Sequence, residues 1–218
     1  MESLDSLPSC DIYRLVTGQM ASNCYFVVDR DTKKGVVIDP GDDAEYIIET
    51  ITSLSIAPKA IFLTHGHFDH AMAALPVQKT FDLPLYLHHD DRFLLDRMEE
   101  SARHFLGIGQ VDPPANVTHG VTNKLALRIG NTALTALSTP GHTPGSVTIV
   151  VNKGEALFVG DVMFEGGSVG RTDFSYSDTA TLKKSIQLIL GFAGKTPLYP
   201  GHGEPTTVGA EKMYHRAT

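Results

Sequence analysis

The 218-residue chain lacks the features that would place it outside the cell or in a membrane. Only two cysteines occur, Cys10 and Cys24, so no disulfide framework is indicated, and neither lies in a recognisable thiol motif. No segment approaches the roughly 20 apolar residues that span a bilayer. The first residues, MESLDSLPSCD, carry acids where a secretory signal needs bases and an apolar stretch. These absences favour a cytoplasmic protein with no membrane partner.

Basic charge is also scarce. The formal net charge is −7, whereas binding to a phosphate backbone calls for a basic face, so nucleic acid is not the expected partner. Hydrophobic residues make up 42% and charged residues 20%, the balance of an ordinary globular protein. No low-complexity tract and no Pro/Gly/Ser-rich linker divides the sequence. We therefore predict a single domain over residues 1–218, a monomer or small homo-oligomer that acts on a small molecule.

Short β-rich runs alternate with helical patterns in both halves of the chain. Strands are predicted at residues 12–16, 24–28, 35–38, 60–63, 85–87, 125–129, 132–137, 146–151, 155–159 and 196–199. Apolar residues at helical spacing predict helices over 44–54, 71–81 and 179–190, and residues 89–116 carry no strand signal. The near-continuous apolar strands need cover on both faces. This pattern predicts an α/β fold in which two sheets pack face to face under helices.

One loop concentrates groups that are costly to bury. In THGHFDH, directly after the strand-like run that ends at Leu63, residues 65–70 contain three histidines and an aspartate. A histidine-rich surface loop is the simpler explanation, but the composition makes such a cluster a chance of roughly one in a thousand. Buried imidazoles and carboxylates require partners or a metal. The motif therefore indicates a site.

Three further stretches end a strand-like run in a potential metal ligand: His142, Asp161 and His202, each preceded by glycine. Glycine lets the backbone turn sharply and approach a bound group closely. With His65, His67, Asp69 and His70 they provide seven nitrogen or oxygen donors and no thiolate. Such donors suit zinc first, and also iron or manganese. Seven exceed the needs of one tetrahedral ion, so we expect two divalent ions that share one carboxylate.

The ordered series THGHFDH, PGHTPGS, VGDVMFEGGSVGRTDF and YPGHGEPT resembles the metallo-β-lactamase superfamily, and within it the short glyoxalase II-like hydrolases. The resemblance runs from the turn at residues 38–41 to the end of the chain. It implies a four-layer αβ/βα sandwich of two mixed β-sheets flanked by helices, with a two-metal cleft at one edge. By the family pattern, the ligands of one metal are His65, His67 and His142. Those of the other are Asp69, His70 and His202, and Asp161 bridges the pair.

The resemblance also implies a reaction, hydrolysis of a glutathione-type acyl thioester such as S-lactoylglutathione by a hydroxide between the metals. Asp69 or Asp161 is the expected proton acceptor. Arg171, in the loop after Asp161, is the natural partner of a substrate carboxylate, and an ion pair with Asp173 is the alternative. Phe68 and Phe164 are predicted to wall the cleft, or else to be core residues. The chain departs from full-length glyoxalase II, because only sixteen residues follow His202 and the basic helical segment is missing.

Other activities of the same superfamily remain open at this point. Persulfide dioxygenases share H-x-H-x-D-H and GRTDF but use one iron, and their last histidine lies in a different motif. Lactonases and β-lactamases share the metals but not GRTDF or GEPT. A non-catalytic metal-binding or partner-binding module is a different class of function, and the complete set of ligands argues against it.

Neighbouring residues are expected to orient the ligands. Candidates are Asp39, Thr64 and Ser146, with ordinary turn bonding as the alternative, and Gly66 is expected to leave room between two imidazoles. The remaining histidines are predicted to lie outside the site: His88, His89, His104, His119 and His215.

Overall fold

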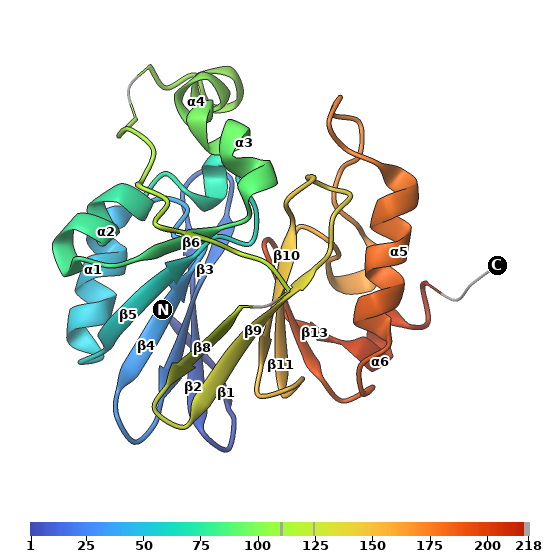
Figure 1. Cartoon of the computed structure of the whole chain (residues 1–218), viewed down its shortest axis with the longest axis horizontal. Coiled ribbons are helices and arrows are strands. Elements are labelled where there is room, and N and C mark those ends of the chain that lie inside the picture. Colours follow the sequence, from blue (N-terminus) through green and yellow to red (C-terminus); the bar gives the residue numbers. More distant parts are fainter. Residues whose placement is uncertain (110, 124, 216–218) are drawn as a thin grey trace.

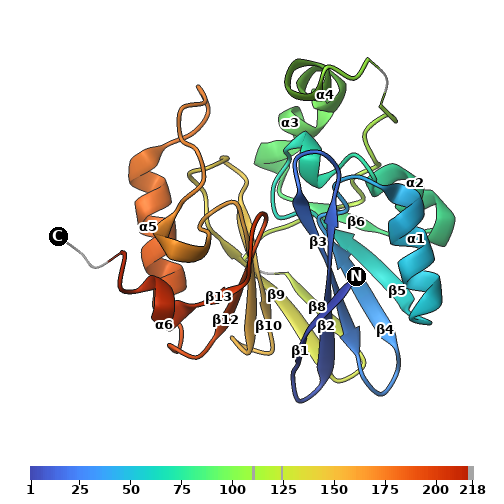
Figure 2. The same ribbon diagram turned by 180° about the vertical axis from the view of Figure 1, so that it is seen from behind.

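Two β-sheets pack face to face, and helices cover their outer faces (Figures 1 and 2). The computed structural model describes residues 1–109, 111–123 and 125–215. Helices α1 (Ala44–Ser53) and α2 (Ala74–Phe81) cover the first sheet, and α5 (Thr179–Leu190) and α6 (Val208–Glu211) cover the second. Helices α3 (Arg92–Asp96) and α4 (Met98–Leu106) lie beyond one end of the sheets.

Both sheets are mixed. The first has the strand order β1-β2-β3-β4-β5-β6-β7, antiparallel from β1 to β4 and parallel from β4 onward. Its strands are β1 (Glu2–Ser6), β2 (Cys10–Thr17), β3 (Ser22–Asp29), β4 (Lys34–Ile38), β5 (Ala57–Phe62), β6 (Leu85–Leu87) and β7 (His119–Gly120). The second has the order β13-β12-β11-β10-β9-β8, in which only β11 and β12 run parallel. Its strands are β8 (Ala126–Ile129), β9 (Thr132–Ser138), β10 (Val147–Val151), β11 (Ala156–Gly160), β12 (Pro197–Pro200) and β13 (Thr206–Thr207).

Strand alternation divides the core into three apolar layers. In β3, Phe26 faces α1 and α2, whereas its neighbour Tyr25 faces the second sheet, where its ring centroid lies 5.1 Å from that of Phe158. Successive side chains of a strand point to opposite faces, so a strand between two layers buries both faces, and its middle, residues 24–28 of β3, is a continuous apolar run. All eight residues of β3 are buried. The predicted α/β fold of two mixed sheets under helices is therefore confirmed.

The local predictions differ from the structure at one helix start, and several short elements were not predicted, namely strands β1, β7 and β13 and helix α6. The helix expected from residue 71 begins at Ala74, after the 3₁₀ turn η1 (Phe68–His70), because residues 67–71 bend to direct side chains at the site. Strand β1 was not predicted: Glu2–Ser6 is an edge strand, mostly exposed, and carries no apolar alternation. In the described part of the chain, no helix is long and apolar enough to cross a membrane.

Candidate metal centre

Four loops meet at one edge of the two sheets, and they carry all seven predicted ligands. The loop after β5 holds His65, His67, Asp69 and His70. The other three ligands follow strands of the second sheet: His142 follows β9, Asp161 follows β11 and His202 follows β12. The two sheets are joined directly here, because Val147 donates a backbone hydrogen bond of 2.8 Å to the Thr64 carbonyl. A rigid scaffold thus holds the loops together.

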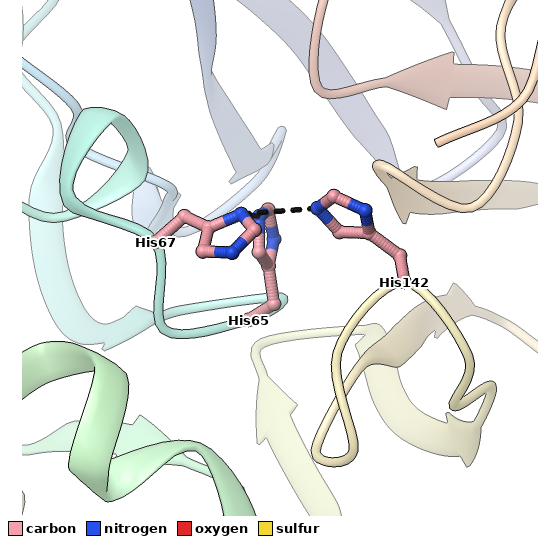
Figure 3. A group of neighbouring side chains, drawn as sticks. All are labelled: His65, His67 and His142. Carbon is pink, nitrogen blue, oxygen red and sulfur yellow. Dashed lines mark hydrogen bonds between the residues drawn. The ribbon is translucent and has the colours of Figure 1, made fainter. Parts of the chain in front are cut away.

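Three imidazole rings form the first group. Figure 3 shows His65 and His67 projecting from one loop and His142 from another, with their rings turned toward one another. Nδ1 of His67 lies 3.1 Å from Nε2 of His65 and 3.0 Å from Nε2 of His142. These nitrogen atoms are potential ligands for one cation.

The second group lies beside the first. Nε2 of His202 is 3.3 Å from Nε2 of His70 and 3.2 Å from Oδ2 of Asp69. Asp161 lies between the two groups. Its Oδ2 is 3.7 Å from Nε2 of His142 in the first group and 3.6 Å from Nε2 of His202 in the second. Asp161 is therefore placed where one carboxylate can face both groups.

The hydrogen bonding and the spacing of these donor atoms are both those of ligands around metal ions. Oδ1 of Asp161 is buried and has no hydrogen-bond partner among the described residues, although a buried carboxylate oxygen needs a donor or a cation. Two ligands about 2.05 Å from a tetrahedral zinc lie about 3.3 Å apart, close to the separations of the ring nitrogens. Nitrogen and carboxylate donors without thiolates are typical of divalent ions in catalytic rather than structural sites.

Hydrogen bonds on the side away from the centre determine which ring nitrogen of each histidine carries the hydrogen and which keeps a lone pair. Nδ1 of His142 lies 2.9 Å from the backbone carbonyl of Arg171, which can only accept, so Nδ1 carries the hydrogen. Nδ1 of His70 likewise lies 3.1 Å from Oδ2 of Asp39. The Thr64 hydroxyl donates to Asp39 at 2.6 Å and can therefore accept from Nδ1 of His65, 3.1 Å away. In the neutral form of all three rings the lone pair is on Nε2, which faces the centre.

Burial and charge shift the pKa values of these groups in opposite directions. Burial, reinforced by neighbouring rings, lowers the pKa of His65 well below its ordinary value and that of His67 to about 3. Burial also acts to lower the pKa of His70, but nearby carboxylates, first those of Asp69 and Asp161, outweigh it and raise the pKa to about 10. The same two carboxylates raise the pKa of His202 against the effect of its burial. Without a cation, His70 is thus a ring that holds a proton among the carboxylates at pH 7.

Of the supporting residues, Ser146 shows the alternative, ordinary turn bonding, and the expectation for Gly66 is wrong. Ser146 contacts no ligand ring; its hydroxyl lies 2.6 Å from that of Thr143. Gly66 does not make room between imidazoles: a Cβ there would lie 2.5 Å from the backbone oxygen of Asp91. Gly66 therefore lets a different segment, the end of the 3₁₀ turn η2 (His89–Asp91), approach the loop.

Asp91 is a functional candidate that the sequence did not reveal. Its buried carboxylate accepts hydrogen bonds from the backbone N–H of Gly66 at 2.9 Å and of Gly145 at 2.6 Å. It also accepts one from the Thr143 hydroxyl at 2.6 Å. Asp91 thus connects the loop of His65 and His67 to the loop of His142. No motif marks it, because its partners are 25 to 54 positions away in the sequence.

The loop of His202 is held by contacts from the first sheet. The backbone N–H of Asn23 donates to the carbonyl of Gly201 at 2.7 Å, and the buried Arg14 guanidinium donates to that of Gly203 at 2.9 Å. Gly201 has to be glycine, because a Cβ there would lie 2.1 Å from Oδ1 of Asp161. The glycine before His202 thus allows the close approach that the sequence predicted.

A cavity of about 380 Å³ opens over the metal centre, a volume within the range of small-molecule sites. All three predicted substrate residues line it: Phe68, Phe164 and Arg171. Arg171 also forms the alternative ion pair, in which Nη2 lies 2.7 Å from Oδ2 of Asp173. Tyr176, which was not predicted, lines the cavity as well, and its hydroxyl lies 2.9 Å from Nε2 of His67.

The remaining histidines make local contacts. Nδ1 of His88 accepts from the backbone N–H of Asp90 at 3.3 Å, and Nε2 of His89 lies 3.0 Å from the Asp90 carboxylate. His119 contacts the Thr118 hydroxyl at 2.8 Å. None of the five lines the cavity.

Comparison with known proteins identifies the family. The model of the metallo-beta-lactamase superfamily matches residues 17–203. The chain belongs to the metallo-beta-lactamase superfamily. Within this superfamily it is 35% identical over 192 residues to the hydroxyacylglutathione hydrolase GloC of Haemophilus influenzae, covering 87% of this chain and 89% of that protein. The fold and the His/Asp groups together indicate divalent metal ions in this superfamily member.

Two solved structures of superfamily members are similar over nearly their whole length. BLEG-1, a B3 metallo-beta-lactamase, has a TM-score of 0.84 and 36% identity, and the match covers 94% of this chain and 98% of that one. The protein TTHA1623, in a di-iron-bound form, has a TM-score of 0.82 and 34% identity, with coverages of 91% and 96%. These relatives differ in the activity or metal that their names give.

Proposed function

We propose that this protein is a binuclear metallohydrolase that cleaves acyl thioesters, as glyoxalase II-like enzymes do. The observation that carries the proposal is Asp161, whose carboxylate faces both groups of donors and keeps one buried oxygen without a hydrogen-bond partner. The likeness to GloC supports the thioester class. Zinc is the metal expected first, and the di-iron form of TTHA1623 makes iron the second candidate.

The chain's own residues would bind the metals and move a proton. His65, His67 and His142 would hold one ion and Asp69, His70 and His202 the other, with Asp161 shared. The chemistry that divalent ions supply there is activation of water at neutral pH and polarisation of a carbonyl oxygen. Asp69 and Asp161 both line the cavity and can accept the proton of the attacking water. A C–O bond forms at the carbonyl carbon, the C–S bond breaks, and the proton leaves with the thiol.

Two other activities deserve a direct comparison. Hydrolysis of a β-lactam is suggested by the likeness to BLEG-1 and needs the same metals and cleft. Oxidation of a persulfide needs one iron with an open coordination position and would leave Asp69, His70 and His202 without a function. The complete second group of donors therefore favours a hydrolase.

Thiol release under anaerobic conditions tests the proposal. Protein loaded with zinc or manganese is expected to cleave S-lactoylglutathione or another simple acyl thioester without oxygen, and His142→Ala and Asp161→Ala should be inactive but folded. A chromogenic β-lactam, a lactone and glutathione persulfide serve as comparison substrates. Rapid persulfide-dependent oxygen uptake, with no thiol released from any thioester, would reject the proposal.

A further inference from the structure

The mouth of the cavity gathers exposed apolar side chains. Of the nine large apolar side chains that are exposed in the described part of the chain, three line this cavity: Met20 at 37%, Phe105 at 45% and Val169 at 41%. They come from separate segments, the β2–β3 turn, α4 and the loop after the 3₁₀ turn η3 (Glu165–Gly167). Single exposed apolar residues are ordinary, but several that converge on one cavity mark a binding surface.

Aromatic rings continue this surface toward the metal centre. Phe105 stacks on Phe68, with ring centroids 5.7 Å apart and an interplanar angle of 8°. Phe174 stacks on Tyr176 at 5.2 Å and 10°, and Tyr176 contacts His67. An apolar group of the substrate can therefore remain in contact with the walls from the mouth to the reacting carbonyl.

The cavity provides little charge for an anionic substrate. Among the described residues that line it, Arg171 is the one lysine or arginine side chain. Its guanidinium makes two hydrogen bonds to Asp173, at 2.9 and 2.7 Å, and lies 4.8 Å from the centre of the Phe174 ring. Asp173 thus neutralises Arg171. Glutathione carries two carboxylates, and a carboxylate at this position would have to compete with Asp173.

We infer that the cleft selects acyl thioesters by an apolar acyl chain, and that it does not recognise the glutathione portion. This inference rests on the proposed thioester hydrolysis and names the substrate class of the same site. Each methylene that leaves water for an apolar wall contributes about fourfold to binding when it is fully buried. The rim of the cavity is partly exposed, so a smaller factor per methylene is expected.

Four substrates test separately the preference for an apolar acyl chain and the lack of glutathione recognition. They are the acetyl and hexanoyl thioesters of N-acetylcysteamine and of glutathione. With the metal-loaded protein, kcat/KM should be at least about tenfold higher for hexanoyl than for acetyl on either thiol. Exchange of N-acetylcysteamine for glutathione should not raise kcat/KM. A glutathione thioester preferred tenfold or more, or no dependence on acyl chain length, would overturn the inference while leaving thioester hydrolysis intact.

A matched pair of variants tests whether the cavity is responsible. Phe105→Ser should reduce the hexanoyl-to-acetyl ratio of kcat/KM about fivefold, because it removes an apolar wall at the mouth. Leu188→Ser is the control, since Leu188 is similarly exposed, at 53%, but lies on α5 away from the cavity. It should leave the ratio unchanged. Equal ratios in wild type and Phe105→Ser would count against the cavity as the source of selectivity.

Binding without turnover distinguishes failure of the inference from failure of the proposed function. Calorimetry on chelator-treated protein would compare three thioethers: S-hexyl-N-acetylcysteamine, S-hexylglutathione and S-methylglutathione. Both hexyl compounds should bind with dissociation constants within about threefold, and the methyl compound at least tenfold more weakly. If the hexyl compounds bind in this way but no thioester is cleaved, the proposed function fails and the apolar selectivity stands. If S-methylglutathione binds as tightly as S-hexylglutathione, the selectivity fails.

Discussion

Oδ2 of Asp39 lies 2.6 Å from the Thr64 hydroxyl and 3.1 Å from Nδ1 of His70. One buried carboxylate therefore orients ligands of both groups, His70 directly and His65 through Thr64. Asp39 occupies the left-handed backbone region, with φ of +52°, a conformation that asparagine also tolerates. Its position at the end of β4, beside the strand that leads to the histidine loop, makes this contact possible.

Asp39→Asn is expected to weaken metal binding about 10- to 100-fold while the protein stays folded. The amide tolerates the backbone conformation, but donors face both oxygens of Asp39: the Thr64 backbone N–H bonds to Oδ1 at 2.7 Å, and the Thr64 hydroxyl and His70 bond to Oδ2. In either orientation the NH₂ group of asparagine would face one of these donors. Competition with a chromogenic chelator measures the effect. Asp82→Asn is the matched control, because Asp82 is exposed and also has a positive φ, +51°. Equal metal affinity in Asp39→Asn and wild type would exclude an orienting role for Asp39.

The purified protein should bind about two divalent ions per chain, because seven donors with a shared Asp161 make two sites. His202→Ala should reduce the content to about one ion, since it removes a ligand of the second group only. Elemental analysis after gel filtration gives the ratio, and circular dichroism checks the fold. A single tight ion, unchanged in His202→Ala and Asp69→Ala, would indicate a mononuclear site instead.

Metal binding at pH 7 should release at least about one proton, contributed first by His70. The pKa of His70 is raised to about 10 in the metal-free site, so the ring is protonated at pH 7 and a cation must displace that proton. His67, with a pKa near 3, is already neutral and contributes none. The apparent metal affinity therefore rises with pH from 7 toward 10. Calorimetry in buffers of different ionisation enthalpy measures the release, and a value of zero would contradict the prediction.

The raised pKa also sets how the stability of the metal-free protein depends on pH. His70 binds its proton more tightly in the folded than in the unfolded state, so its contribution to stability is complete below about pH 6.5. That contribution is lost as the pH rises through about 10. The pKa of His67 is lowered, so its effect on stability is opposite: the folded protein loses stability as the pH falls from 6.5 to 3, because the unfolded chain then binds the proton more tightly. Urea unfolding of chelator-treated protein should therefore give lower stability at pH 9 than at pH 7, and metal-loaded protein should not show this loss.

Asp91→Asn should lower the free energy of unfolding by about 1–3 kcal/mol, because the new NH₂ group faces a donor and leaves it without an acceptor. It should also weaken metal binding, since Asp91 joins the loop of His65 to that of His142. Asp90→Asn is the control, because the neighbouring Asp90 side chain is 46% exposed. Urea unfolding and chelator competition give the two values. A loss of stability with unchanged metal affinity would assign Asp91 to the fold alone.

Local sequence was sufficient to predict the longer strands and helices and the residues that carry the potential ligands. Strand β3 and helix α5 follow from runs with clear apolar patterns. Three ligand loops follow from glycine-marked strand ends, and the fourth follows from its cluster of histidines. The edge strand Glu2–Ser6 was not predicted, because an exposed edge is held by backbone pairing to β2 and needs no apolar alternation. The role predicted for Gly66, room between two imidazoles, was wrong because the group that Gly66 accommodates is the backbone of Asp91, which comes from a distant segment.

The sequence by itself determined which groups are available for chemistry: three nitrogen donors and one carboxylate in residues 65–70, and one further ligand after each of three later strands. These follow from residue type and spacing, which are local. Only the tertiary structure decided that Asp161 faces both groups and that Asp91 joins two loops. Hydrogen bonds and charges act over a few ångströms, and packing of the two sheets brings groups within that range that are far apart in the chain.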